Sequence, residues 1–265
     1  MAILDEIIVS KKIELKAQKE FIDEETLISY IELSLDEPRG FVSALQRKIK
    51  QGKTAIIAEA KKASPSLGTI RNVFIPQVIA KAYEDNGATC ISVLTEKNFF
   101  QGSIINLRKI RAATKLPLLR KDFLFEEYQV IESRAIGADC ILLVASILEH
   151  QELLNMTRLA YDLGMDVLVE VHNEQELEKV LSANLPIHMI GINNRNLKDL
   201  TINLDNSIEL MKKIPKDIIV VSESGISTKE DISKLKAVGI NCFLIGAALM
   251  KLQDIGYGLK TLLEE

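Results

Sequence analysis

The stretch EEYQVIESRAIGADCILLVAS, residues 126–146, contains the pattern that decides the fold of this chain. Residues 126–135 have helical character, and Gly137-Ala138-Asp139 forms a turn into the apolar run DCILLVAS (139–146). A short apolar run bounded by turn residues is typical of a buried strand. A helix, a turn and a strand in this order make one unit of an alternating α/β chain.

Seven further runs of this kind lie along the chain: AIIAEAK (55–61), TCISVLT (89–95), PLLRKD (117–122), DVLVEV (166–171), IHMIGIN (187–193), DIIVVSES (217–224) and NCFLIG (241–246). Longer helix-like segments separate them. Eight strands alternating with eight helices predict a (β/α)8 TIM barrel, and 265 residues are close to the roughly 250 typical of this fold. A doubly wound nucleotide-binding fold is the structural alternative, but no GxGxxG motif follows the first run.

The residues before the first run form a helical N-terminal extension, residues 1–50, of the single domain expected over 1–265. Two amphipathic helices are indicated there, by the apolar positions Leu4, Ile7, Ile8 and Leu15 and then Phe41, Leu45 and Ile49. Such an extension either plugs the bottom of the barrel or covers its mouth. Sequence periodicity does not choose between these two positions.

Composition excludes several classes of protein. The chain is 47% hydrophobic with a formal charge of −4, and its charges of both signs are interspersed, so we expect no nucleic-acid partner. No run approaches the roughly 20 apolar residues that span a membrane, and the charged first residues do not resemble a signal peptide. Cys90, Cys140 and Cys242 lie inside predicted strands without CxxC spacing, which predicts buried thiols and no metal site. We expect a cytoplasmic monomer, although a dimer remains open.

Polar residues cluster where the apolar runs end, which is where this fold carries its active site. Strand side chains alternate between faces, so Glu59 and Lys61 share one face. The same alternation predicts that five more side chains face the interior at the barrel mouth: Lys121, Glu170, Asn193, Arg195 and Glu223. Close ammonium groups lower one another's pKa and dry carboxylates have theirs raised, which favours acid–base chemistry near neutrality. The chain is therefore predicted to be an enzyme.

A phosphate site is predicted beside these charged residues. The seventh run ends in Ser224-Gly225 and the eighth in Gly246-Ala247. Barrels often bind phosphate with the loops after these two strands, through backbone N–H groups to which glycine allows close approach. The loop after the first run contains Ser64-Pro65-Ser66, which could form a rigid elbow with hydroxyls facing the mouth; an ordinary solvated turn is the alternative.

The chain resembles the indole-3-glycerol phosphate synthase family. The blocks that carry the resemblance are Glu59-Ala60-Lys61-Lys62-Ala63-Ser64-Pro65-Ser66, LTEKNFFQGS (94–103), LLRKDF (118–123), LVEVH (168–172), IGINNRNL (190–197), SESGI (222–226) and FLIGAALM (243–250). They cover nearly the whole chain in order. The resemblance implies a carboxy-lyase of tryptophan biosynthesis, without cofactor or metal. It would close the indole ring of 1-(2-carboxyphenylamino)-1-deoxyribulose 5-phosphate with loss of carbon dioxide and water.

The resemblance also implies residue roles. Lys121 would stabilise and protonate the developing oxyanion, Lys61 would bind the anthranilate carboxylate and share the acid role, and Glu170 would be the general base of dehydration. Glu59 would orient the lysines, and Asn193 would hold the reacting hydroxyls. The remaining substrate contacts are implied for Ser64, Gly225, Gly246 and Ala247 at the phosphate, Arg195, Glu223 and Ser224 at the ribulose, Pro65, Phe100, Phe123 and Leu142 at the anthranilate ring, and Leu244 nearby.

Two details qualify this comparison. Family members often have Ser, Thr or Glu at the position of Ala247, so one phosphate hydrogen bond worth about 0.5–1.5 kcal/mol is missing. His172 has the opposite parity to Glu170 and is interpreted as structural.

Two functional alternatives are considered as well. A phosphoribosylanthranilate isomerase-like enzyme would need a Cys/Asp acid–base pair at the strand ends, whereas the cysteines here lie within strands. A non-catalytic phosphosugar-binding or pathway-scaffold barrel would have no need of Lys61, Lys121 and Glu170 together.

Overall fold

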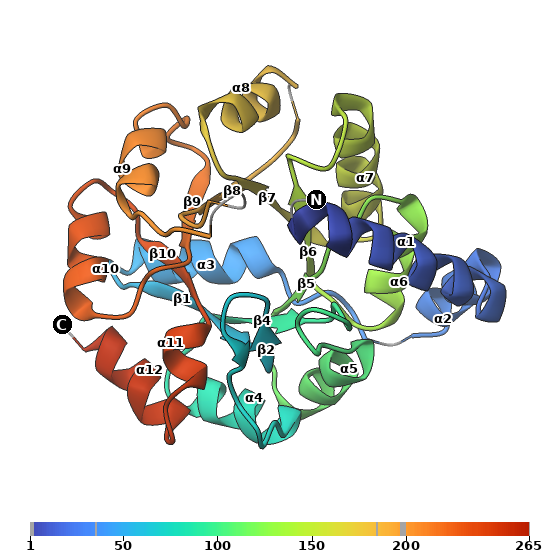
Figure 1. Ribbon diagram of the computed structural model, residues 1–265, viewed down its shortest axis with the longest axis horizontal. Helices are drawn as coiled ribbons and strands as arrows, with labels where there is room; N and C mark the ends of the chain where they lie inside the picture. Colours follow the sequence, from blue (N-terminus) through green and yellow to red (C-terminus); the bar gives the residue numbers. More distant parts are fainter. Residues whose placement is uncertain (1–2, 35, 184, 197–199, 265) are drawn as a thin grey trace.

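The computed structural model describes residues 3–34, 36–183, 185–196 and 200–264 and forms a closed barrel of eight parallel strands (Figure 1). The order around the barrel is β1-β10-β9-β8-β7-β6-β5-β4. This confirms the predicted TIM barrel, and each strand lies within one predicted run. The strands are β1 (Ala55–Ala60), β4 (Cys90–Leu94), β5 (Leu118–Lys121), β6 (Cys140–Val144), β7 (Asp166–Val171), β8 (Met189–Asn193), β9 (Ile219–Glu223) and β10 (Cys242–Ile245).

A ring of helices surrounds the strands (Figure 1). Local signals explain where several of them begin and end: Ser103 and Asn173 accept hydrogen bonds from backbone N–H groups of their helices, and Gly137 and Gly239 follow helix ends with positive φ. The ring comprises α4 (Pro76–Asp85), α5 (Ile104–Ala113), α6 (Glu127–Ala135), α7 (His150–Asp162), α8 (Glu174–Ser182), α9 (Asp205–Met211), α10 (Lys229–Lys236), the short α11 (Ala247–Met250) and α12 (Ile255–Leu263).

Strand residues alternate between two separate apolar clusters. One cluster fills the barrel and includes Ile57, Leu119, Leu142 and Leu168. The other packs the outer strand faces against the helices, with alternate residues such as Ile56. This alternation confirms the predicted parity and places the side chains of Glu59, Lys121, Glu170, Asn193 and Glu223 above the inner cluster.

The N-terminal extension occupies both of the predicted positions. Helix α3 (Phe41–Lys50) plugs the bottom: Phe41 and Leu45 are fully buried in the inner cluster, and the N–H of Val42 donates to Asp166 at the start of β7. Helix α1 (Ile3–Phe21) lies at the mouth, where Ile7 lines the cavity described below. Helix α2 (Glu24–Glu32) joins α1 in packing on α6.

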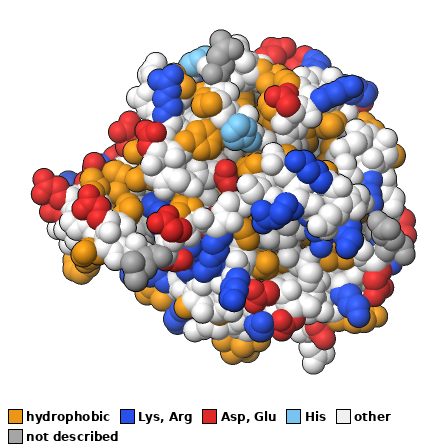
Figure 2. Space-filling model, turned by 180° about the vertical axis from the view of Figure 1, so that it is seen from behind, with side chains coloured by type: hydrophobic (Ala, Val, Ile, Leu, Met, Phe, Trp, Pro, Cys, Tyr) orange, Lys and Arg blue, Asp and Glu red, His pale blue; other side chains and the backbone are white. Residues whose placement is uncertain are grey.

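Other features of the described residues bear on the class of protein. No helix among them is long and apolar enough to cross a membrane. Cys90, Cys140 and Cys242 are free and buried, as predicted. Figure 2 shows one face of the molecule, on which basic and acidic side chains are spread among one another. A short antiparallel hairpin, β2 (Ala63–Ser64) with β3 (Gly68–Thr69), follows β1 at the mouth.

Candidate active site

A cavity of about 540 Å³ opens at the carboxyl ends of the strands. Every residue selected from the sequence lines it: Glu59, Lys61, Ser64, Pro65, Phe100, Lys121, Phe123, Leu142, Glu170, Asn193, Arg195, Glu223, Ser224, Gly225, Leu244, Gly246 and Ala247. Residues more than 180 positions apart in the chain thus meet around one space. The one motif residue outside the described ranges is Leu197.

The centre of the cavity is a lysine between two carboxylates. Nζ of Lys121, at the end of β5, lies 2.7 Å from Oε2 of Glu170 on β7 and 3.3 Å from Oε2 of Glu223 on β9. Glu170 also accepts a 3.2 Å hydrogen bond from the side-chain amide of Asn193. All four groups converge from different strands, so the barrel and not any local motif creates this cluster.

A glycine makes room for the second carboxylate. Gly191 lies on β8, between the strands that carry Glu170 and Glu223, and a Cβ at this position would lie 2.2 Å from Oε1 of Glu223. Gly246 makes room for Glu59 on β1 in the same way, because a Cβ added at Gly246 would lie 2.2 Å from Oε1 of Glu59. Both glycines are needed for the space they leave, since neither has a positive φ.

The pKa of Lys121 differs from the one expected from the sequence. Burial alone would lower the pKa of Lys121, but the surrounding carboxylates Glu170, Glu223 and Glu59 raise it above its ordinary value. The expected lowering by a second ammonium group is therefore wrong, because Lys121 is enclosed by carboxylates. Lys121 holds its proton firmly until a stronger base develops beside it.

The pKa values of the two carboxylates are shifted in opposite directions. Burial would raise the pKa of Glu170, but Lys121 and His172 hold it well below its ordinary value. Burial raises the pKa of Glu223 to about 8; Lys121 opposes this, while the charge of Glu170 adds to it. One ammonium group cannot neutralise two carboxylates equally, so Glu170 is ionised and Glu223 retains a proton at neutral pH.

The raised pKa of Glu223 predicts that the stability of the protein depends on pH. Folded Glu223 keeps its proton to about pH 8, whereas an unfolded glutamate releases it near 4.5, so the folded state binds more protons between these values. The contribution of Glu223 to the free energy of unfolding should therefore fall as pH rises through this window, by at most about 1.4 kcal/mol per pH unit. Urea unfolding between pH 5 and 8 should show this slope in the parent and a flatter one in Glu223→Gln. Equal slopes would contradict the assignment.

His172 lies behind Glu170 and does not line the cavity. Its Nε2 is 3.2 Å from Oε1 of Glu170 and its Nδ1 is 3.0 Å from Oε2 of Glu176. Burial would lower the pKa of His172, but these two carboxylates raise it to about 10. Glu170 is thus held between a charged histidine and a charged lysine.

A second ion pair lies across the cavity. Nζ of Lys61 is 2.6 Å from Oε1 of Glu59, and the pair shares one face of the chain as predicted. The hairpin that follows presents Ser64, whose hydroxyl is buried without a hydrogen-bond partner among the described residues. An unsatisfied hydroxyl in a cavity is ready to bind a polar ligand group.

The backbone turns sharply after β9. Ser224 and Gly225 both have positive φ, at 65° and 84°, which is uncommon for serine. The side-chain amide of Asn194 holds this turn, donating to the carbonyls of Glu223 at 2.9 Å and of Ser224 at 3.1 Å. Beyond β10, Gly246 and Ala247 begin the short helix α11 next to the same turn. These two segments form one wall of the cavity.

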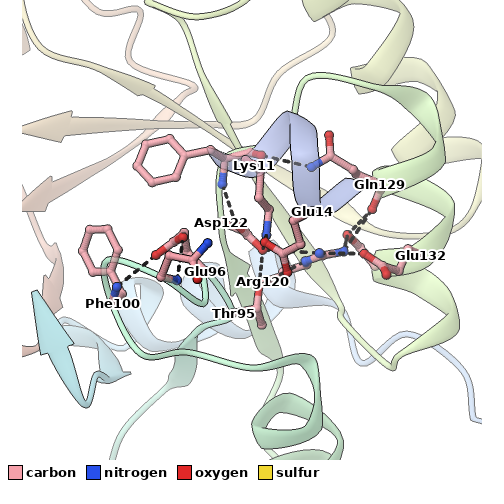
Figure 3. A network of polar contacts seen from close by, with 12 residues as sticks. Lys11, Glu14, Thr95, Glu96, Phe100, Arg120, Asp122, Gln129 and Glu132 are labelled. Atoms are coloured by element: carbon pink, nitrogen blue, oxygen red, sulfur yellow. Dashed lines mark hydrogen bonds and ion pairs between the residues drawn. The ribbon is translucent and has the colours of Figure 1, made fainter. Parts of the chain in front are cut away.

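Two aromatic rings form the opposite wall. The ring centroids of Phe100 and Phe123 lie 6.3 Å apart, and both rings border the cavity. Glu96, which is fully buried, accepts hydrogen bonds from the N–H groups of Phe99 and Phe100 and so fixes this loop (Figure 3). Phe100 is therefore a cavity residue rather than core.

Some residues that shape the site were not selected from the sequence. Glu96 and Asn194 lie within quoted blocks, but their roles depend on loop conformations that no periodicity predicts. The α1 residues Leu4 and Ile7 belong to the predicted apolar stripe and Ile3 does not, and the position of this helix at the mouth required the tertiary structure. Among the described residues, no cluster of His, Cys, Asp or Glu could hold a metal ion.

Comparison with known proteins identifies the family. The family model for indole-3-glycerol phosphate synthase matches residues 4–262. The chain belongs to this family. The indole-3-glycerol phosphate synthase of Polynucleobacter asymbioticus is 44% identical over 264 residues, 98% of each chain, and that of Polaromonas sp. (strain JS666) is 50% identical over 224 residues, 84% of each. The chain is accordingly a carboxy-lyase of tryptophan biosynthesis that acts on a small phosphosugar.

More distant solved structures share only the fold of this synthase. The 3-hexulose-6-phosphate synthase of Salmonella typhimurium superposes with a TM-score of 0.62 at 13% identity, covering 78% of this chain and 96% of that one. The N-acetylmannosamine-6-phosphate 2-epimerase of Clostridium perfringens gives 0.58 at 15% identity, covering 74% and 87%. The isomerase alternative loses support, because no cysteine is among the residues that line the cavity.

Proposed function

We propose that this cavity closes the indole ring of 1-(2-carboxyphenylamino)-1-deoxyribulose 5-phosphate, with Lys121 as general acid and Glu170 as general base. The observation that carries the proposal is the Lys121 ammonium group held between Glu170 and Glu223 at the open end of the barrel. Its surroundings keep the lysine protonated and Glu170 ionised. An acid and a base are thus present together in the required protonation states.

The walls of the cavity suggest how the substrate lies. The phosphate is assigned to the wall made by Gly225, Gly246 and Ala247, with the unpaired Ser64 hydroxyl beside it. The anthranilate ring is assigned to the apolar wall, which Pro65, Leu142, Phe100 and Phe123 supply. Arg195, Glu223, Ser224 and Leu244 line the space between for the ribulose. The substrate carboxylate then reaches Lys61, whose present partner is Glu59.

Ring closure needs an acid at the carbonyl oxygen. The aromatic carbon bearing the carboxylate attacks the ribulose carbonyl, a C–C bond forms, and the carbonyl electrons move to oxygen, which takes the proton of Lys121. The C–CO₂ bond then breaks and returns its electrons to the ring. Lys61 binds the carboxylate before this step and is a second candidate donor, and Glu59 orients the lysines.

Dehydration needs a base. Glu170 removes a proton from the carbon next to nitrogen, the C–OH bond breaks, and the hydroxyl takes a proton from the ammonium group of Lys61, the second candidate donor, and leaves as water. Asn193 bonds to Glu170 and is placed to hold the hydroxyl groups. The test is direct: purified protein is mixed with the substrate, and indole fluorescence is followed without added cofactor or metal. A steady rise supports the proposal, and intact binding without a rise overturns it in favour of a phosphosugar-binding barrel.

The variant Glu170→Gln tests the base. Glutamine keeps the shape and the amide contact with Asn193 but cannot accept a proton, so kcat should fall by about 100-fold. The dissociation constant of the substrate, measured by calorimetry, should change little, because Glu170 is assigned to no binding contact. The matched control is Glu174→Gln, an exposed carboxylate on α8 that should leave kcat unchanged. A parent-like kcat for Glu170→Gln would contradict the assignment.

We propose further that the chain works as a monomer in the cytoplasm. The support is that the described residues of one chain supply every group assigned to the reaction. Sedimentation equilibrium should give a mass near 29.6 kDa, and twice that mass would contradict the proposal.

A further inference from the structure

Helix α1 has a charged residue in its buried stripe. Ile7, Lys11 and Leu15 are its buried residues, spaced by one helical turn each, and Lys11 is only 2% exposed. The stripe predicted from apolar positions omitted Lys11 because it is charged. Since burying an ammonium group costs free energy unless it is paired, the partner of Lys11 explains why it is there.

Nζ of Lys11 lies 3.2 Å from Oε2 of Glu14 on its own helix, and the partner of Lys11 outside α1 is Asp122, immediately after β5 (Figure 3). Nζ of Lys11 donates to Oδ2 of Asp122 at 2.9 Å, and the side chain of Asp122 is completely buried. The same oxygen accepts from Oγ1 of Thr95 at 2.6 Å and Nη2 of Arg120 at 3.3 Å. Burial favours neutral Asp122, but Lys11 and Arg120 hold its pKa below the ordinary value. Asp122 is therefore a charged junction between α1, β5 and the loop after β4.

The junction is directly connected to the reacting lysine. Asp122 follows Lys121 in the chain, and its Oδ1 accepts from the N–H of Phe123 at 2.9 Å. The N–H of Thr95 donates to the carbonyl of Lys121 at 3.1 Å. The carboxylate thus contacts the side chain of Arg120, which precedes Lys121, and the backbone of Phe123, which supplies a ring of the apolar wall.

Arg120 joins the junction to α6, and Lys11 joins it to α1. Arg120 is fully buried, lies 2.7 Å from Glu132 on α6, and donates to Ser133 at 3.0 Å. Lys11 is the contact from α1, one turn beyond Ile7 at the cavity wall. One buried contact therefore links α1 at the mouth to the residue next to Lys121.

We propose that Lys11 is a positioning residue for ring closure. Through Asp122 it fixes α1 over the mouth and holds Lys121 and Phe123 in the geometry that the reaction requires. Lys11 itself does not line the cavity and reaches no reacting atom. This inference rests on the proposed role of Lys121 as the general acid.

The test is the steady-state kinetics of Lys11→Met. Methionine has a similar length and keeps apolar packing in the stripe, but it removes the contact with Asp122. Misplacing a catalytic group by about 1 Å costs roughly 100-fold in rate, so kcat should fall by about 10- to 100-fold with KM changed much less. Lys11→Arg, which restores a cation, should recover most of kcat. A parent-like kcat for Lys11→Met overturns the proposal.

Two control variants separate positioning from simple docking of α1. Lys19→Met removes an exposed ion pair between the same helix and Glu126, in the same β5–α6 connection, and should keep the parent kcat. Leu15→Ala weakens the packing of α1 against Tyr128 and Ile131 without touching Asp122. It should lower the unfolding midpoint yet keep kcat at temperatures where the protein is folded. A loss of kcat in Leu15→Ala as large as in Lys11→Met overturns the proposal.

A double-mutant cycle completes the test. If Lys11 acts through Asp122, then Lys11→Met combined with Asp122→Asn should cost no more kcat than the more harmful single change. If the kcat losses of the two single variants multiply in the double variant, the proposal is wrong. Lys121→Met distinguishes the two levels of argument: turnover within tenfold of the parent in that variant means that the proposed role of Lys121 as general acid is wrong. An inactive Lys121→Met beside a normal Lys11→Met means that only the positioning role is wrong.

Discussion

Lys121→Met is expected to lower kcat by about 10³- to 10⁴-fold while substrate binding persists. The change removes both the proton donor and the positive charge at the developing oxyanion, each of which typically contributes two or more orders of magnitude. Without the ammonium group, the pKa of Glu170 should rise, because Lys121 is its largest lowering influence after burial is counted. The measurements are kcat from indole fluorescence and the dissociation constant from calorimetry.

A control variant and a chemical rescue test whether the loss in Lys121→Met is specific to the ammonium group. Lys97→Met removes an exposed lysine from the loop after β4 and should leave kcat unchanged. Lys121→Cys, alkylated with 2-bromoethylamine, rebuilds an ammonium side chain and should regain activity. The three native cysteines are buried, so the folded protein should be modified only at the new thiol. Turnover within tenfold of the parent in Lys121→Met would show that another group is the acid.

The second large effect expected is a loss of stability on changing Asp139, a residue at the bottom of the barrel. Asp139→Ala should lower the free energy of unfolding by about 3–5 kcal/mol, as removal of one partner of a buried ion pair does. The buried carboxylate of Asp139 accepts from Nη1 of Arg111 at 2.8 and 2.7 Å. It also accepts from the N–H groups of Arg39 and Leu118, each at 2.7 Å. Its loss would leave Arg111 buried with half of its charge compensation.

Asp36→Ala provides the matched control for Asp139→Ala. Asp36 pairs with the same Arg111 at 2.5 Å, but its side chain is 45% exposed, so its removal should cost only about 0–1 kcal/mol. Urea unfolding of both variants under one set of conditions gives the comparison. If Asp36→Ala proves as destabilising as Asp139→Ala, burial does not determine the strength of these pairs.

Much of the fold was readable because its signals are local. The apolar runs, their spacing and turn residues such as Gly137 and Gly239 depend only on neighbouring positions, and they predicted the strands within a few residues. Parity then predicted which side chains face inward, since alternate strand residues share a face whatever the strand is paired with. The same reasoning could not assign Glu96 or Asn194, whose contacts depend on loop shape.

The sequence by itself thus determined the barrel, the end at which polar groups gather, and the family resemblance. Only the tertiary structure decided which charges are partners. Glu170 lies 49 positions from Lys121, and Asp122 lies 111 positions from Lys11. Such distances in the chain carry no periodic signal. Because a pKa depends on the neighbours in space, only the structure indicates that Lys121 is held protonated and that Glu223 retains a proton. Only the packing of the folded chain places α1 at the mouth and α3 at the bottom of the barrel.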